Sequence, residues 1–109
     1  MRISEKLPFE VSQAVCRLGD SVRLARVRRR LSQAELAETA HITRKTLYSI
    51  EKGVPSISIG NIYSVLWSLG LLDTSTALAD PDRDDHGKIL EAARQPKRVR
   101  QASAIDNDF

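Results

Sequence analysis

The stretch from Ser32 to Gly53 contains two helix starts and one helix stop in close succession. Ser32 is followed three residues later by Glu35, the spacing of a capping box. In such a box the hydroxyl accepts from the Glu35 amide, and the carboxylate reaches back to the Ser32 amide. Thr43 is a second N-cap, and Gly53 ends the helix that Thr43 begins. Two short helices joined by a tight turn therefore constrain the fold more than any other feature of the chain.

The side chains of these two helices separate into an inner and an outer set. Apolar or small residues recur at positions that predict a close crossing of the helices: Ala34, Leu36, Ala37, Ala40, Leu47 and Ile50. Polar residues of the second helix are left on the outside: Arg44, Lys45, Tyr48 and Ser49. This arrangement is a helix-turn-helix, whose second helix enters the major groove of DNA.

Arg44 and Lys45 occupy the first turn of the second helix. Cations at a helix N-terminus oppose the macrodipole by up to ~1 kcal/mol, so another demand is expected to keep them there. A polyanion meets that demand, because a recognition helix approaches base edges with its first turns. The alternative is that both are ordinary solvated surface residues. The residues expected to read bases are Arg44, Lys45, Ser49, Thr43 and Tyr48.

Apolar stripes on both sides of the motif complete a small core. Upstream, Val11, Val15, Leu18, Val22 and Ala25 predict an amphipathic helix within residues 9–30, either continuous or broken near Gly19. Downstream, Ser58 caps a helix whose buried stripe is Ile59, Ile62, Val65, Leu66 and Leu69. The first of these helices ends in a cluster of like charges that phosphates would neutralise, or that is simply solvated: Arg23, Arg26, Arg28, Arg29 and Arg30.

Charge is distributed unevenly along the 109 residues, whose net charge is +3. Residues 1–72 carry 11 Lys and Arg against 6 Asp and Glu, whereas residues 73–91 carry 2 against 6. The basic excess therefore belongs to the helix-turn-helix half, as expected for a protein that binds nucleic acid. No paired carboxylates, glycine-rich phosphate loop or activated nucleophile is present, so we expect no enzyme and no cofactor. Cys16 is interpreted as a plain free thiol, and His41 and His86 as residues without a metal.

The C-terminal third is harder to interpret. Trp67 falls off the buried stripe beside three leucines, which favours a dimer or partner seam over packing against the following helix. The residues of this seam are Trp67, Leu69, Leu71 and Leu72. A short helix capped by Asp73 or Thr74, a break at Asp80-Pro81 and a second helix then form an acidic arm. The tail from Gln95 is too poor in apolar residues to fold alone, and the role of Phe109 stays open.

Three motifs resemble the lambda-repressor-like, Cro-type (Xre) DNA-binding domain over residues 18–70. They are Leu18-Gly19-x-x-Val22-Arg23-x-x-Arg26, Leu31-Ser32-Gln33-x-x-Leu36-Ala37 and Ile42-Thr43-x-x-Thr46-Leu47-x-x-Ile50-Glu51-x-Gly53. The resemblance implies that Glu51 ties the third helix to Arg26 and that Gln33 contacts a phosphate. It also favours a break near Gly19 over one continuous first helix. The full set of implied phosphate contacts is Ser32, Gln33, Lys52, Ser56 and Asn61. His41 stands where this family usually has a left-handed glycine, which predicts a slightly costlier turn of the same shape.

We therefore expect an all-α protein with a lambda-repressor-like helix-turn-helix domain of four to five helices, a C-terminal helical arm and a disordered tail. The expected divisions are residues 1–17 (N-terminal helical extension), 18–72 (DNA-binding domain), 73–94 (acidic helical arm) and 95–109 (basic, then acidic tail). The arm is expected either to pack on the dimer or to dock a basic partner protein. The single Cys16 and the lack of a secretory segment or apolar span indicate a cytoplasmic, nucleoid-associated protein without a membrane segment. The resemblance implies a homodimeric repressor of a palindromic operator. In particular it points to a HipB-like antitoxin that neutralises a HipA-type kinase toxin. A stand-alone or phage-type repressor and a protein-interaction module without DNA are the alternatives.

Overall fold

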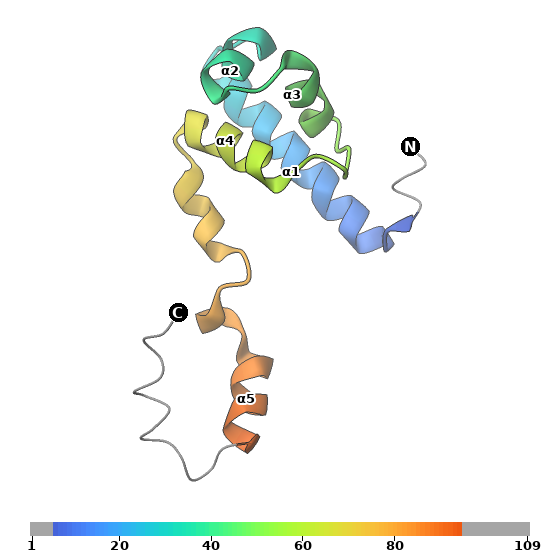
Figure 1. Cartoon of the computed structure of the whole chain (residues 1–109), viewed down its shortest axis with the longest axis vertical. Coiled ribbons are helices and arrows are strands. Elements are labelled where there is room, and N and C mark those ends of the chain that lie inside the picture. Colours follow the sequence, from blue (N-terminus) through green and yellow to red (C-terminus); the bar gives the residue numbers. More distant parts are fainter. Residues whose placement is uncertain (1–5, 95–109) are drawn as a thin grey trace. The chain divides into compact units, whose positions relative to one another are not determined.

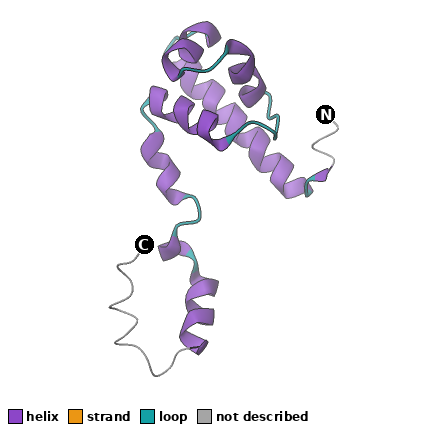
Figure 2. Cartoon of the chain, viewed as in Figure 1, coloured by secondary structure: helices purple, strands orange, loops and turns teal. Residues whose placement is uncertain are grey.

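The computed structural model describes residues 6–94, and all regular elements within them are helical, so the all-α prediction is confirmed (Figure 2). The chain divides into two units between Ser75 and Thr76. The first holds α1 (Phe9–Arg28), α2 (Gln33–Ala40), α3 (Arg44–Glu51) and α4 (Ile59–Leu69), and the 3-10 helix η2 (Leu72–Ala77) begins at its end. The second holds the 3-10 helix η3 (Pro81–Arg83) and α5 (Asp85–Arg94). The predicted divisions at residues 17/18 and 72/73 fall inside α1 and η2.

Helix α1 runs without interruption, so the break that the resemblance favours near Gly19 is wrong. Gly19 is buried against the end of α3: a Cβ placed on it would lie 2.5 Å from the Ile50 carbonyl oxygen and 2.9 Å from that of Glu51. The glycine therefore permits a close approach between two helices instead of a bend. The first turns of α1 extend past the other three helices (Figure 1). Phe9, in the first of these turns, is 73% exposed.

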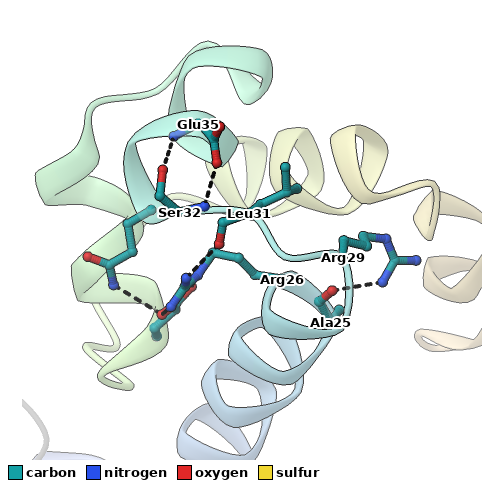
Figure 3. A network of polar contacts seen from close by, with 8 residues as sticks. Ala25, Arg26, Arg29, Leu31, Ser32 and Glu35 are labelled. Carbon is teal, nitrogen blue, oxygen red and sulfur yellow. Dashed lines mark hydrogen bonds and ion pairs between the residues drawn. The ribbon is translucent and has the colours of Figure 1, made fainter.

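The predicted caps of α2 and α3 are confirmed. The Ser32 hydroxyl accepts from the Glu35 amide at 3.0 Å, and a Glu35 carboxylate oxygen accepts from the Ser32 amide at 2.8 Å (Figure 3). The Thr43 hydroxyl accepts from the Thr46 amide at 3.0 Å. Beyond α3, Gly53 has a φ of 80°, and its amide donates back to the Ile50 carbonyl. Because each cap satisfies amides or carbonyls that the helix leaves unpaired, these residues fix where the two helices begin and end.

The turn between α2 and α3 has the left-handed residue that the sequence predicts. His41 has φ 62° and ψ 38°. Its amide donates to the Glu38 carbonyl at 3.2 Å, and the Ile42 amide donates to the Ala37 carbonyl at 3.0 Å. These two bonds close the end of α2 in the manner of a Schellman motif, normally built on glycine.

The core forms where α2 packs on α3 and α4 while α1 packs on the same two helices. Its buried side chains are Val22, Ala25, Leu36, Ala37, Ala40, Leu47, Ile50, Val65 and Leu69. Three residues of the expected stripes are exposed, and each lies in the first turn of its helix: Val11, Ala34 and Ile59. Leu69 is only 4% exposed, so its assignment to a dimer or partner seam is wrong. It is committed to the core of its own chain.

After Gly70, which ends α4 with a φ of 78°, the chain forms η2 in place of the expected capped helix. Asp73 and Thr74 lie inside this element, so neither is its cap. The Thr74 and Ser75 hydroxyls donate to the carbonyls of Leu71 and Leu72, both at 2.7 Å. Such local side-chain bonds to carbonyls three residues back compete with the α-helical ladder, and short 3-10 segments are the usual result.

In the second unit, the Asp80 carboxylate accepts from the Asp82 amide and Pro81 opens η3, as the expected break requires. An Asp84 carboxylate oxygen accepts from the Gly87 amide at 2.9 Å at the start of α5. No residue of α5 is buried. The tail predicted over residues 95–109 lies outside the described residues.

Candidate nucleic-acid interface

Glu51, the last residue of α3, is the centre of a polar network that joins three helices. Its carboxylate accepts from Arg26 Nε at 2.7 Å and from Arg26 Nη2 at 3.0 Å. Gln33 Nε2 donates to the same carboxylate at 3.1 Å. Arg26 also donates to the Leu31 carbonyl at 2.9 Å, which ties the loop before α2 to α1 (Figure 3). The tie between Glu51 and Arg26 that the resemblance implies is thus confirmed.

The network stabilises the ionised forms of both the Glu51 carboxyl group and the Arg26 guanidinium. Burial is the largest influence on Glu51 and raises its pKa. Hydrogen bonds from Arg26 and Gln33, together with the charges of Arg26 and Arg23, outweigh burial and hold the Glu51 pKa below its ordinary value. For Arg26, the hydrogen bond to Glu51 is the largest influence and raises the pKa, which burial partly offsets. The network is therefore a charged structural link between α1, α2 and α3.

The outward face of α3 carries the side chains predicted to read bases. Arg44, Lys45 and Tyr48 are exposed, and Ser49 is half-buried. The Lys52 ammonium lies 5.5 Å from the centre of the Tyr48 ring, a cation–π distance. Thr43 is exposed, but its hydroxyl serves the helix, since it accepts from the Thr46 amide and donates to the Thr46 hydroxyl.

Two hollows lie side by side along this face. The smaller, about 280 Å³, is lined by Gln33, Arg44, Lys45 and Tyr48 and by no carboxylate. The larger, about 490 Å³, shares Gln33 and Tyr48 with it and is completed by Cys16, Asp20, Arg23, Glu51 and Lys52. A hollow lined only by side chains that can donate hydrogen bonds suits an anion such as a backbone phosphate.

The predicted phosphate contacts fall into two groups. Gln33 and Lys52 lie on the hollows together with the residues of α3. Ser56 and Asn61 line neither hollow, and the Ser32 amide and hydroxyl are both engaged with Glu35. The structure adds one link that the sequence does not predict, the bond from Gln33 to Glu51. It holds the Gln33 amide group in place beside α3 without any ligand.

Trp67 contacts the turn of the helix-turn-helix, which neither interpretation of its sequence position foresaw. It is 57% exposed, and its ring system is stacked on the His41 ring with centroids 6.3 Å apart and planes 23° apart. Leu71 is half-buried against the core, and Leu72 is exposed. Of the predicted seam, only Trp67 and Leu72 present large exposed surfaces.

Residues 6–94 contain no group of three His, Cys, Asp or Glu side chains placed to hold a metal ion. Within the same span, every helix is too short or too polar to cross a membrane.

Comparison with known families identifies the central segment. Residues 22–66 match the family model described as helix-turn-helix. The match begins in the second half of α1, includes all of α2 and α3, and ends within α4. It indicates that this segment is a DNA-binding helix-turn-helix domain of the Xre type, as found in transcription regulators. Neither the curated proteins nor the solved structures yield a match to the chain.

Proposed function

We propose that this protein is a dimeric transcriptional repressor that binds a palindromic operator and places α3 in the major groove. The observation that carries the proposal is the donor-lined hollow formed by Gln33, Arg44, Lys45 and Tyr48 at the start of the recognition helix. The helix-turn-helix match over residues 22–66 supports it.

The residues of the site would contact either the bases or the sugar-phosphate backbone of DNA, depending on their position. Arg44 lies in the first turn of α3. It would meet a guanine edge, with Lys45 and Ser49 assisting. Gln33, Lys52 and Arg23 lie on the neighbouring hollows and would contact the sugar-phosphate backbone. Phosphate contacts set position and affinity, whereas base contacts set sequence preference.

Two copies are needed to read a palindrome, with their recognition helices about one helical turn of DNA apart, ~34 Å. Exposed apolar surface at Leu72, just after α4, would join them. We further propose that the protein is the antitoxin of a two-gene module and binds a HipA-type kinase through its acidic segment after Asp80. The family resemblance and the acidic stretch 73–91, which carries 6 Asp and Glu against 2 Lys and Arg, support the antitoxin role.

Selection of duplexes from a random pool, followed by a footprint on the DNA upstream of the gene, tests the proposed function. We expect a palindromic site and a logarithm of affinity that falls linearly with the logarithm of salt concentration, by about 0.9 per phosphate neutralised. A protein-interaction module would show neither. Co-purification with the product of the neighbouring gene separates an antitoxin from a stand-alone repressor, since only the antitoxin brings a kinase with it.

A further inference from the structure

The turn between α2 and α3 sets the direction of α3. Its central residue, His41, has a left-handed backbone conformation that histidine does not favour. His41 has a φ of 62°, in the left-handed region where the backbone of any residue other than glycine is strained by its Cβ. The left-handed form costs an L-residue roughly 1–2 kcal/mol, somewhat less for His than for branched side chains. The two hydrogen bonds that close the end of α2 offset part of this cost. Helix α3, whose direction the turn sets, begins only three residues later, at Arg44.

Two residues of α4 also contact this turn. Trp67 stacks on the His41 ring at a centroid distance of 6.3 Å. The neighbouring residue, Ser68, shares a hydrogen bond of 2.6 Å with the Thr39 hydroxyl, near the end of α2. Two adjacent residues of α4 thus hold two residues at the end of α2. Aromatic pairs contribute about 0.5–1.5 kcal/mol beyond the surface they bury, which is comparable with the cost of the turn.

We propose that Trp67 is a positioning residue for DNA recognition: by stacking on His41, it holds the left-handed turn that sets the direction of the recognition helix. The proposal rests on the proposed function for its effect on DNA, but the stacking itself acts without DNA. Without Trp67, a fraction of molecules leaves the left-handed turn, and the apparent dissociation constant rises in inverse proportion to the fraction that remains competent.

The test is a double-mutant cycle of Trp67→Ala and His41→Gly in the full chain. Glycine adopts the left-handed turn at no steric cost and has no ring to stack, so Trp67 should become dispensable beside it. We expect Trp67→Ala alone to raise the dissociation constant for a duplex selected by the parent protein about two- to tenfold. In the His41→Gly background the same change should have no effect, and Trp67→Phe, which keeps a stacking face, should bind as the parent does.

A second measurement does not need DNA. The Ile42 amide bonds to the Ala37 carbonyl across the turn, so its hydrogen exchange reports opening of the turn. Its exchange should accelerate about two- to tenfold in Trp67→Ala and not in the double variant. Ile59→Ala, which truncates another exposed apolar side chain of α4, is the matched control and should change neither readout.

Equal effects of Trp67→Ala in the two backgrounds would overturn the proposal and favour loss of a dimer contact, which a glycine at position 41 cannot restore. If the parent selects no duplex at all, the proposed function fails, and the exchange cycle still decides whether Trp67 holds the turn.

Discussion

The guanidinium of Arg26 and the carboxylate of Glu51 meet in two hydrogen bonds of 2.7 and 3.0 Å although 25 residues separate them in the chain. Glu51 closes the recognition helix and is only 8% exposed, so its charge is stabilised mainly by this partner. Removing one member of a buried ion pair leaves the other charge uncompensated, at a cost of about 3–5 kcal/mol. The pair therefore links α1 to the end of α3 and contributes to the stability of the domain.

A pH dependence follows from the low pKa of Glu51. Because its folded-state pKa lies below the unfolded value of about 4.3, the unfolded chain binds more protons between the two values. The stability that Glu51 contributes is fully present above about pH 4.3 and is lost as the pH falls through the folded pKa. Urea unfolding of the parent and Glu51→Gln at intervals from pH 6 to pH 3 measures this. As the pH falls below about 4.3, the free energy of unfolding should decrease more in the parent than in Glu51→Gln. An identical pH dependence of the two proteins would contradict a lowered pKa of Glu51.

Gly19 should not tolerate a methyl group. In Gly19→Ala the new Cβ would meet backbone oxygens of Ile50 and Glu51, which can move only if the end of α3 moves. We expect a loss of about 1–3 kcal/mol in the free energy of unfolding, the usual cost of overpacking. Gly60→Ala is the matched control, because Gly60 also lies in a helix but has nothing within 4 Å of the added Cβ. That variant should gain up to about 1 kcal/mol from helix propensity. Thermal unfolding that ranks the two variants the other way would show that α1 does not need this close approach.

How far the sequence predicts this fold depends on the range of the interactions concerned. Ser32, Thr43 and Gly53 act on backbone groups within a few residues, so their roles could be predicted from spacing alone. Gly19 was misinterpreted because the atoms that require a glycine belong to α3, far along the chain.

The same distinction applies at the candidate site. The outward residues of α3 follow from helical periodicity, whereas the bond from Gln33 to Glu51 depends on how α2 and α3 pack. The partner of Trp67 could not be found from its own helix, since His41 lies in a turn that belongs to another part of the core. Leu69 fitted both a buried stripe and an exposed seam, and only the packed structure separates these positions.

The Thr43 cap should contribute measurably to α3, which is only eight residues long. Thr43→Ala removes the acceptor of the Thr46 amide, and an N-cap truncation of this kind costs about 1 kcal/mol. Thr43→Ser keeps the acceptor and should retain most of the stability. Circular dichroism during urea unfolding measures both. If Ala and Ser behave alike at position 43, the hydroxyl is not needed to start the recognition helix.

Arg44 and Gln33 line the same hollow, yet their loss should affect DNA binding in different ways. Arg44→Ala should cost about 1–3 kcal/mol on the selected operator and relax the preference at one base position, because a base contact is lost. Gln33→Ala should weaken binding to operator and to unrelated duplexes by similar factors, because a phosphate contact carries no sequence information. Competition titrations with operator and scrambled duplexes at fixed salt separate the two patterns. Arg28→Ala, which removes an exposed arginine that lines neither hollow, controls for net charge. Arg44→Ala with parental affinity and preference would mean that α3 does not read the groove through its first turn.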